Sequence, residues 1–68
     1  MKIIDAKTGR EVRVGDWLRD EKLVSVVPGM FTARAFFEIS PGNLRRVDLQ
    51  VRYMHPDFLF QRVGFIPS

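Results

Sequence analysis

A chain of 68 residues makes a single small domain, and without cysteine it cannot rely on a disulfide framework or a cysteine zinc site. Its core must come from a hydrophobic content of 46%, which includes six phenylalanines, one tryptophan and one tyrosine. The formal net charge is +3, but the acidic residues are scattered among the basic ones, whereas a dedicated nucleic-acid binder usually carries a basic stripe.

The chain shows no targeting or membrane signal. No run of about 18 apolar residues is present, so no transmembrane helix is expected. The amino terminus, residues 1–5, lacks the long apolar core of a signal peptide. The lack of cysteine fits a reducing compartment. We therefore expect a cytoplasmic protein with one β domain over residues 1–68.

The first fifth of the chain predicts a β-hairpin. Residues 3–4 and 11–14 form its two strands, and residues 5–10 between them have turn chemistry. The alternation in the second strand places Val12 and Val14 inward.

Gly15 and Asp16 end this hairpin just before the single tryptophan, Trp17. We expect the Asp16 side chain to bond backbone amides two residues further on rather than to act in catalysis. Trp17 has two interpretations. A lone aromatic ring in a small domain is usually part of the packing, which we favour, whereas an exposed ring would be a platform for a base, a proline or a peptide.

The central part of the chain predicts three strands. After a polar loop at residues 19–22, residues 23–27 are apolar on both sides, which indicates a central or covered strand. Residues 31–39 and 47–53 alternate between apolar and polar positions, which is typical of strands with one buried face. A turn at residues 40–43 joins these two as an antiparallel pair.

The register of this pair can be argued from residue numbers. The buried residues of both strands, Phe37 and Val47 among them, carry odd numbers, so the numbers of opposed residues must add to an even number. This condition favours a three-residue loop, 41–43, which sets Phe37 against Val47 and Glu38 against Arg46. Phe36 then points outward, on a solvated face whose acids and bases largely match.

The end of the chain predicts a turn at residues 54–57 and a final strand at residues 58–66. No segment of ten or more residues has a convincing helical period. Five or six strands with short turns predict an all-β fold, either a small five- to six-stranded barrel or a strongly curled antiparallel sheet.

Two short motifs resemble landmarks of Src-homology-three (SH3) domains. Gly15-Asp16 before an apolar residue is similar to the family's Gly-Asp, and Gly64 to Ser68 is similar to its Gly-x-x-Pro-Ser near the carboxyl end. The tandem tryptophans and the acidic recognition loop of the family are not evident, and the two motifs lie further apart than in the family. The resemblance implies an SH3-like small barrel and transfers no ligand residues.

The residues that catalysis needs are sparse. His55 is the only histidine, and nothing places it with a serine and an acid as a triad. The only adjacent carboxylates are Asp20 and Glu21, and no glycine-rich phosphate loop precedes a helix. We therefore expect no enzyme, with no catalytic residue, no metal, no cofactor and no small-molecule substrate.

Two kinds of function remain open. The first is a non-enzymatic protein-interaction or structural module, homo-oligomeric or part of a bacterial or phage assembly, whose surplus aromatic residues contact a protein partner or a second copy: Trp17, Phe36, Phe58 and Phe60. The second is a nucleic-acid-binding barrel with exposed aromatics and four arginines that the predicted pairing leaves without acids: Arg13, Arg45, Arg52 and Arg62. We favour the first, because aromatic residues are plentiful and basic clustering is not.

Overall fold

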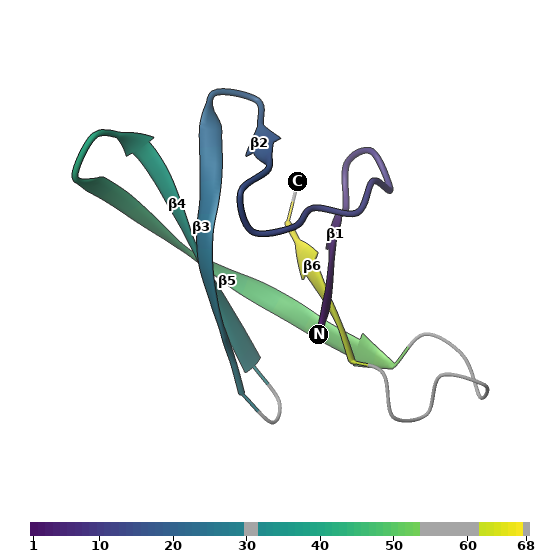
Figure 1. Cartoon of the computed structure of the whole chain (residues 1–68). Helices are drawn as coiled ribbons and strands as arrows, with labels where there is room; N and C mark the ends of the chain where they lie inside the picture. The colour runs from purple at the N-terminus through teal and green to yellow at the C-terminus, as the bar shows by residue number, and fades with distance from the viewer. Residues whose placement is uncertain (30–31, 54–61, 68) are drawn as a thin grey trace.

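All regular elements of the described chain are strands, as the alternating pattern predicted. The structure, a computed structural model, describes residues 1–29, 32–53 and 62–67. One six-stranded sheet has the order β1-β6-β5-β4-β3-β2 (Figure 1). The strands are β1 Lys2–Asp5, β2 Trp17–Leu18, β3 Glu21–Pro28, β4 Thr32–Ser40, β5 Asn43–Tyr53 and β6 Arg62–Ile66.

The sheet curls into a half-barrel, which is compatible with a small SH3-like barrel. In Figure 1, β1 and β3 face each other although three strands separate them in the sheet, and β2 with the chain before it lies between their upper ends. Backbone hydrogen bonds join this connecting segment to β1 on one side and to β3 on the other. Val12 N–H donates to the Ile3 carbonyl at 2.9 Å, and Gly15 N–H donates to the Leu23 carbonyl at 2.7 Å. Residues 10–16 therefore cross the open side of the half-barrel.

The alternation in β4 and β5 separates an inner from an outer face as predicted. Phe37 and Ala35 of β4 are fully buried, and Leu49 of β5 is 5% exposed. These residues form the core together with Ile3, Val12, Leu23, Ala33, Val47 and Ile66. The even-numbered residues of β5 between them, such as Asp48 and Gln50, are exposed.

The predicted register of the β4–β5 hairpin was wrong by two residues, although its parity was right. Ala35 faces Val47 and Phe37 faces Arg45, rather than Leu49 and Val47. The loop has two residues, with Gly42 at a φ of 77°, so no three-residue loop forms. A bulge between Glu38 and Ser40 restores the even sum, and the extra residue, Ile39, is exposed rather than buried.

Strand β3 also contains a bulge, and the strand is longer than predicted. Residues 21–22 were assigned to a loop but belong to β3, and Arg19 and Asp20 alone form the turn after β2. The register with β4 shifts between Leu23 and Ser25. Because of this shift, Val26 faces the core whereas Val27 is 56% exposed. β3 lies between β4 and β2 in the sheet, as expected of a central strand, but its outer face is not covered at Val27.

The predicted first hairpin is reduced to one bridge, between Ile4 and Glu11. Val12 is buried as predicted, but Val14 is 61% exposed because the chain leaves β1 and crosses toward β3. β1 instead pairs in parallel with β6, at the carboxyl end of the chain. The final strand is confirmed over residues 62–66; the rest of the predicted strand and turn, residues 54–61, lies outside the described residues.

Gly64 of β6 allows the inner face to pack closely. A Cβ at this position would lie 3.0 Å from Leu49 Cδ1, 3.2 Å from Met1 Sδ and 3.4 Å from Ile3 Cδ1. Side chains from β1, β5 and the amino terminus therefore fill the space above this glycine. Its φ lies outside the left-handed region, so a larger residue would meet crowding without backbone strain.

We predict that Gly64→Val lowers the free energy of unfolding by about 1–3 kcal/mol, because the added methyl groups overpack this site. Urea unfolding followed by circular dichroism measures the change. Thr32→Val, on an exposed strand position, is the control and should change stability by less than about 0.5 kcal/mol. Equal stability of Gly64→Val and the parent would show that Met1 and Leu49 do not occupy this space.

Candidate interaction surface

Trp17 is exposed, so the favoured interpretation of this ring as packing was wrong. It is 65% exposed, the highest value among the large exposed hydrophobic residues. Its neighbour Leu18 packs against the core instead. In a strand, successive side chains point to opposite faces. Burial of Leu18 therefore leaves the indole of Trp17 on the outer face.

Cross-strand pairing places further apolar residues on the same outer face. One row across four strands contains Trp17, Lys22, Glu38 and Leu44. In the neighbouring row Phe36 faces Ser25 on one side and Arg46 on the other. Phe36 is half-buried and points outward as predicted. We call the four apolar members the outer patch: Trp17, Val27, Phe36 and Leu44.

Cations lie beside the rings of this face. Arg46 is directly opposite Phe36. Arg52 Cζ lies 5.7 Å from the ring centroid of Phe65, within the range of a cation–π contact. Among the described residues, the ion pair on this face joins Arg34 Nε and Asp48 Oδ1 at 3.7 Å. The predicted pair of Glu38 with Arg46 is absent because the register places Leu44 opposite Glu38.

The four arginines predicted to lack acids divide into two groups. Arg45 binds Glu21, and Arg13 Nε lies 3.4 Å from Glu11 Oε1, so for these two the prediction was wrong. Arg52 bonds the Gln50 amide oxygen at 3.3 Å. Arg62 donates to the backbone carbonyl of Gly29, across the half-barrel from β6 to the end of β3. The four arginines therefore do not form one basic patch.

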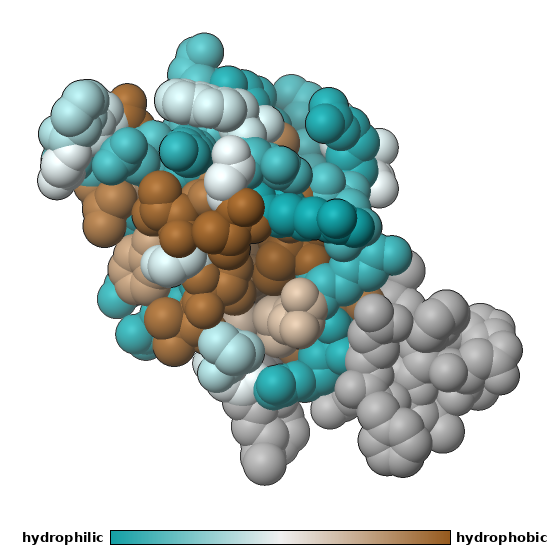
Figure 2. Space-filling view, viewed as in Figure 1, coloured by the Kyte–Doolittle hydropathy of each residue, from teal (hydrophilic) through white to brown (hydrophobic). Residues whose placement is uncertain are grey.

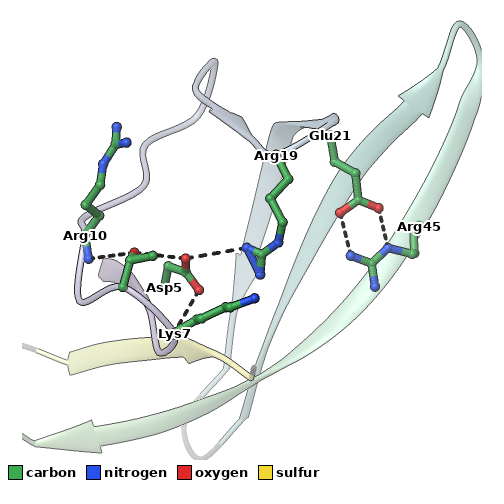
Figure 3. A network of polar contacts seen from close by, with 7 residues as sticks. Asp5, Lys7, Arg10, Arg19, Glu21 and Arg45 are labelled. Atoms are coloured by element: carbon green, nitrogen blue, oxygen red, sulfur yellow. Dashed lines mark hydrogen bonds and ion pairs between the residues drawn. The ribbon is translucent and has the colours of Figure 1, made fainter.

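A polar network lies at the upper end of the half-barrel (Figure 3). Its centre is Asp5, the last residue of β1, which is fully buried. Its carboxylate accepts from Lys7 N–H at 3.2 Å and from the Thr8 hydroxyl at 3.0 Å. Arg19 Nη1, from the turn between β2 and β3, lies 3.6 Å from Asp5 Oδ2. This contact joins opposite sides of the half-barrel.

The second half of the network is a bidentate ion pair. Arg45 Nε and Nη2 donate to the two Glu21 carboxylate oxygens at 2.6 and 2.5 Å. The guanidinium also lies over Phe37, 5.9 Å from its ring centroid, so it covers the largest buried side chain. The hydrogen bond from Arg45 lowers the pKa of Glu21 below its ordinary value, and the same bond raises the pKa of Arg45.

Sequence reasoning missed two features of this region and identified the wrong partner for a third residue. Asp5 was assigned to a turn, and only its complete burial shows a structural carboxylate. Arg19 has a φ of 56°, a left-handed conformation that no residue pattern indicated. Asp16 was correctly predicted to bond backbone, but its Oδ2 accepts from Arg13 N–H at 2.9 Å rather than from a later amide.

Some of the predicted site residues lie outside the part of the chain that the structure describes. Phe58, Phe60 and His55 lie outside them. Within residues 1–29, 32–53 and 62–67 no cluster of three acidic or histidine side chains could hold a metal ion. The same part of the chain contains no helix long and apolar enough to cross a membrane.

Comparison with known proteins finds no protein that is similar to this chain. A scan against protein-family models finds no match, and searches of curated proteins and of solved structures find none either.

We predict that the Glu21–Arg45 pair stabilises the fold in a pH-dependent way. Because folding lowers the pKa of Glu21, the stabilisation is complete above the unfolded-state value, about 4.3, and is lost as the pH falls through the lower folded-state value. Glu21→Gln should therefore reduce the free energy of unfolding at pH 7 by up to about 1 kcal/mol, since Arg45 is half exposed. Urea unfolding at pH 7 and pH 3 measures this, with Asp20→Asn as control. An equal loss at both pH values would contradict an ionic origin.

A pair of variants tests the conformation of Arg19. Arg19→Ala and Arg19→Gly both remove the contact with Asp5, but only glycine adopts a φ of 56° without strain. Thermal unfolding should therefore show Arg19→Gly to be more stable than Arg19→Ala by about 1 kcal/mol. If alanine were the more stable of the two, the left-handed turn would not exist in solution.

Proposed function

We propose that this protein is a non-enzymatic protein-interaction or structural module that associates through the outer patch, either with a second copy or with a subunit of a bacterial or phage assembly. The observation that supports this proposal best is the 65% exposure of Trp17 on the outer face. Large aromatic rings concentrate binding energy at protein interfaces. A cytoplasmic setting remains a prediction.

The surroundings of Trp17 also suit an interface. Val27 and Leu44, at 56% and 55% exposure, share its face, and Phe36 lies between them. Exposed apolar residues that share one face with charged residues are typical of interaction surfaces. Here Lys22 and Glu38 lie between Trp17 and Leu44 in one row, and Arg46 lies opposite Phe36.

An SH3-like barrel is the fold type that we propose for this module. The curled half-barrel supports it, as does Gly15, whose φ of 99° suits a Gly-Asp turn before the exposed Trp17. Gly64 of the second motif lies in a packed strand, so its role here is structural. No ligand residue is transferred with this proposal.

Nucleic-acid binding is the second candidate, supported by the pairing of arginines with rings on the outer face. Arg46 faces Phe36 and Arg52 covers Phe65, and single-stranded nucleic acids bind to arrangements of cations and stacking rings. The ion pairs of Arg13, Arg34 and Arg45 reduce the field that a phosphate would experience. We therefore place this function second.

Association through the outer patch can be measured with the protein's own fluorophore. Because Trp17 is the only tryptophan, its emission should shift to shorter wavelength as rising concentration or an added assembly subunit covers it. Sedimentation equilibrium measures the association constant in parallel. Trp17→Ser or Leu44→Ser should weaken association about tenfold or more, since buried interface anchors each contribute more than about 1 kcal/mol.

Val14→Ser is the matched control, because Val14 is equally exposed but lies outside the outer patch. A single-stranded oligonucleotide titration separates the two candidates. Binding that weakens steeply with salt and is lost in Phe36→Ala, together with a monomer of unchanged Trp17 emission, would replace the proposed function by the second.

A further inference from the structure

One side of β3 has few backbone partners among the residues that the structure describes. β4 pairs with β3 from Lys22 to Pro28. On the opposite side, β2 pairs only with residues 21–22, and Leu23 exchanges backbone bonds with Gly15 and Asp16. Beyond Leu23, no residue in the described part of the chain pairs with this side. Within the described residues, positions 24–28 therefore form a strand edge without a partner, which we call the β3 edge.

The β3 edge has the composition of a strand that accepts a partner. Its sequence, Val-Ser-Val-Val-Pro, contains three β-branched valines and no charge. Natural edge strands are usually protected by charged residues, bulges or proline. In the β3 edge such features occur only at the two ends: a bulge follows Leu23, and Pro28 is the last residue of the strand. Between them lies room for one short added strand, the arrangement by which sheets bind extended peptides.

The inner face beside the β3 edge offers apolar contacts. Val26 is half-buried and packs against the core, as does Val51 of β5. Met1 is 43% exposed, and its sulfur lies over Gly64 on the same face. A thioether adapts to different neighbours. Figure 2 shows a continuous hydrophobic surface in the middle of the view, where Figure 1 shows β3 and the space beside it.

The charge near the end of this edge is positive. Arg62 reaches Gly29, directly after Pro28. The ion pairs found in the described residues involve Arg13, Arg19, Arg34 and Arg45, so none of them neutralises Arg62. A strand with acidic residues complements this end, whereas the net charge of +3 opposes pairing with a second copy.

We propose that the β3 edge accepts an extended strand from a partner protein, with alternate β-branched side chains toward the inner face and a carboxylate near Arg62. This inference depends on the proposed interaction function and specifies a partner and a binding mode for it. Backbone pairing to residues 24–28 provides most of the affinity, and the acidic end sets direction and specificity.

A synthetic peptide tests the proposal directly. We would titrate the isotopically labelled protein with Glu-Val-Thr-Val-Thr-Val-Glu, capped at both ends, and record amide chemical shifts and hydrogen exchange. Saturable shifts should be centred on residues 24–28, and those of their amides that point away from β4 should become protected on binding. Absence of saturation up to about 1 mM peptide would overturn the proposal.

Two matched peptides separate backbone pairing from other binding. A peptide N-methylated at alternate residues keeps every side chain but cannot form a ladder, so it should bind about tenfold more weakly or worse. A peptide with lysine in place of both glutamates should bind about twofold to fivefold more weakly. The protein variant Arg62→Gln should remove this difference between the acidic and basic peptides without abolishing binding of either.

The failure of this inference is distinguishable from failure of the proposed function. Shifts centred on Trp17 and Phe36 with no effect of N-methylation would overturn strand addition while supporting association through the outer patch. Protection of the β3 edge together with unchanged association of Trp17→Ser would support strand addition and contradict the outer patch.

Discussion

The backbone bonds of residues 10–16 determine the shape of this protein. This segment bonds β1 on one side and β3 on the other, so it closes the upper part of a sheet that would otherwise remain open. The Val12 side chain of this segment is buried, and Trp17, which follows the segment, lies on the outer face. Because the segment turns into β2 at Trp17, it leaves residues 24–28 of β3 without a neighbour on that side in the described chain.

Two arginines reinforce the closure at opposite ends of the half-barrel. Arg19 reaches the buried Asp5 carboxylate from the β2–β3 turn, and Arg62 reaches the Gly29 carbonyl from β6. A buried carboxylate is costly unless hydrogen bonds and an opposite charge compensate for lost hydration. Lys7, Thr8 and Arg19 supply that compensation for Asp5. The strained φ of Arg19 is tolerated because its guanidinium completes this arrangement.

The distribution of charge divides the surface by function. At the upper end the cations are matched, since Arg19 and Arg45 are held by Asp5 and Glu21 and hence contribute to stability. On the outer face, Arg46, Arg52 and Lys2 form no ion pair within the described residues. Unmatched charge beside exposed apolar side chains favours recognition of a partner over further stabilisation.

The alternating pattern by itself determined the inner and outer faces of β4 and β5 away from the bulge at Ile39, because side-chain direction in a regular strand depends only on position parity. It therefore predicted Phe37 and Leu49 inside and Phe36 outside. The register, the exposure of Ile39 and the parallel pairing of β1 with β6 were decided by the tertiary structure alone. Bulges shift pairing without changing the local pattern, and contacts between the two ends of a chain leave no local signal, so only the folded sheet reveals the exposed Trp17 and the free edge of β3.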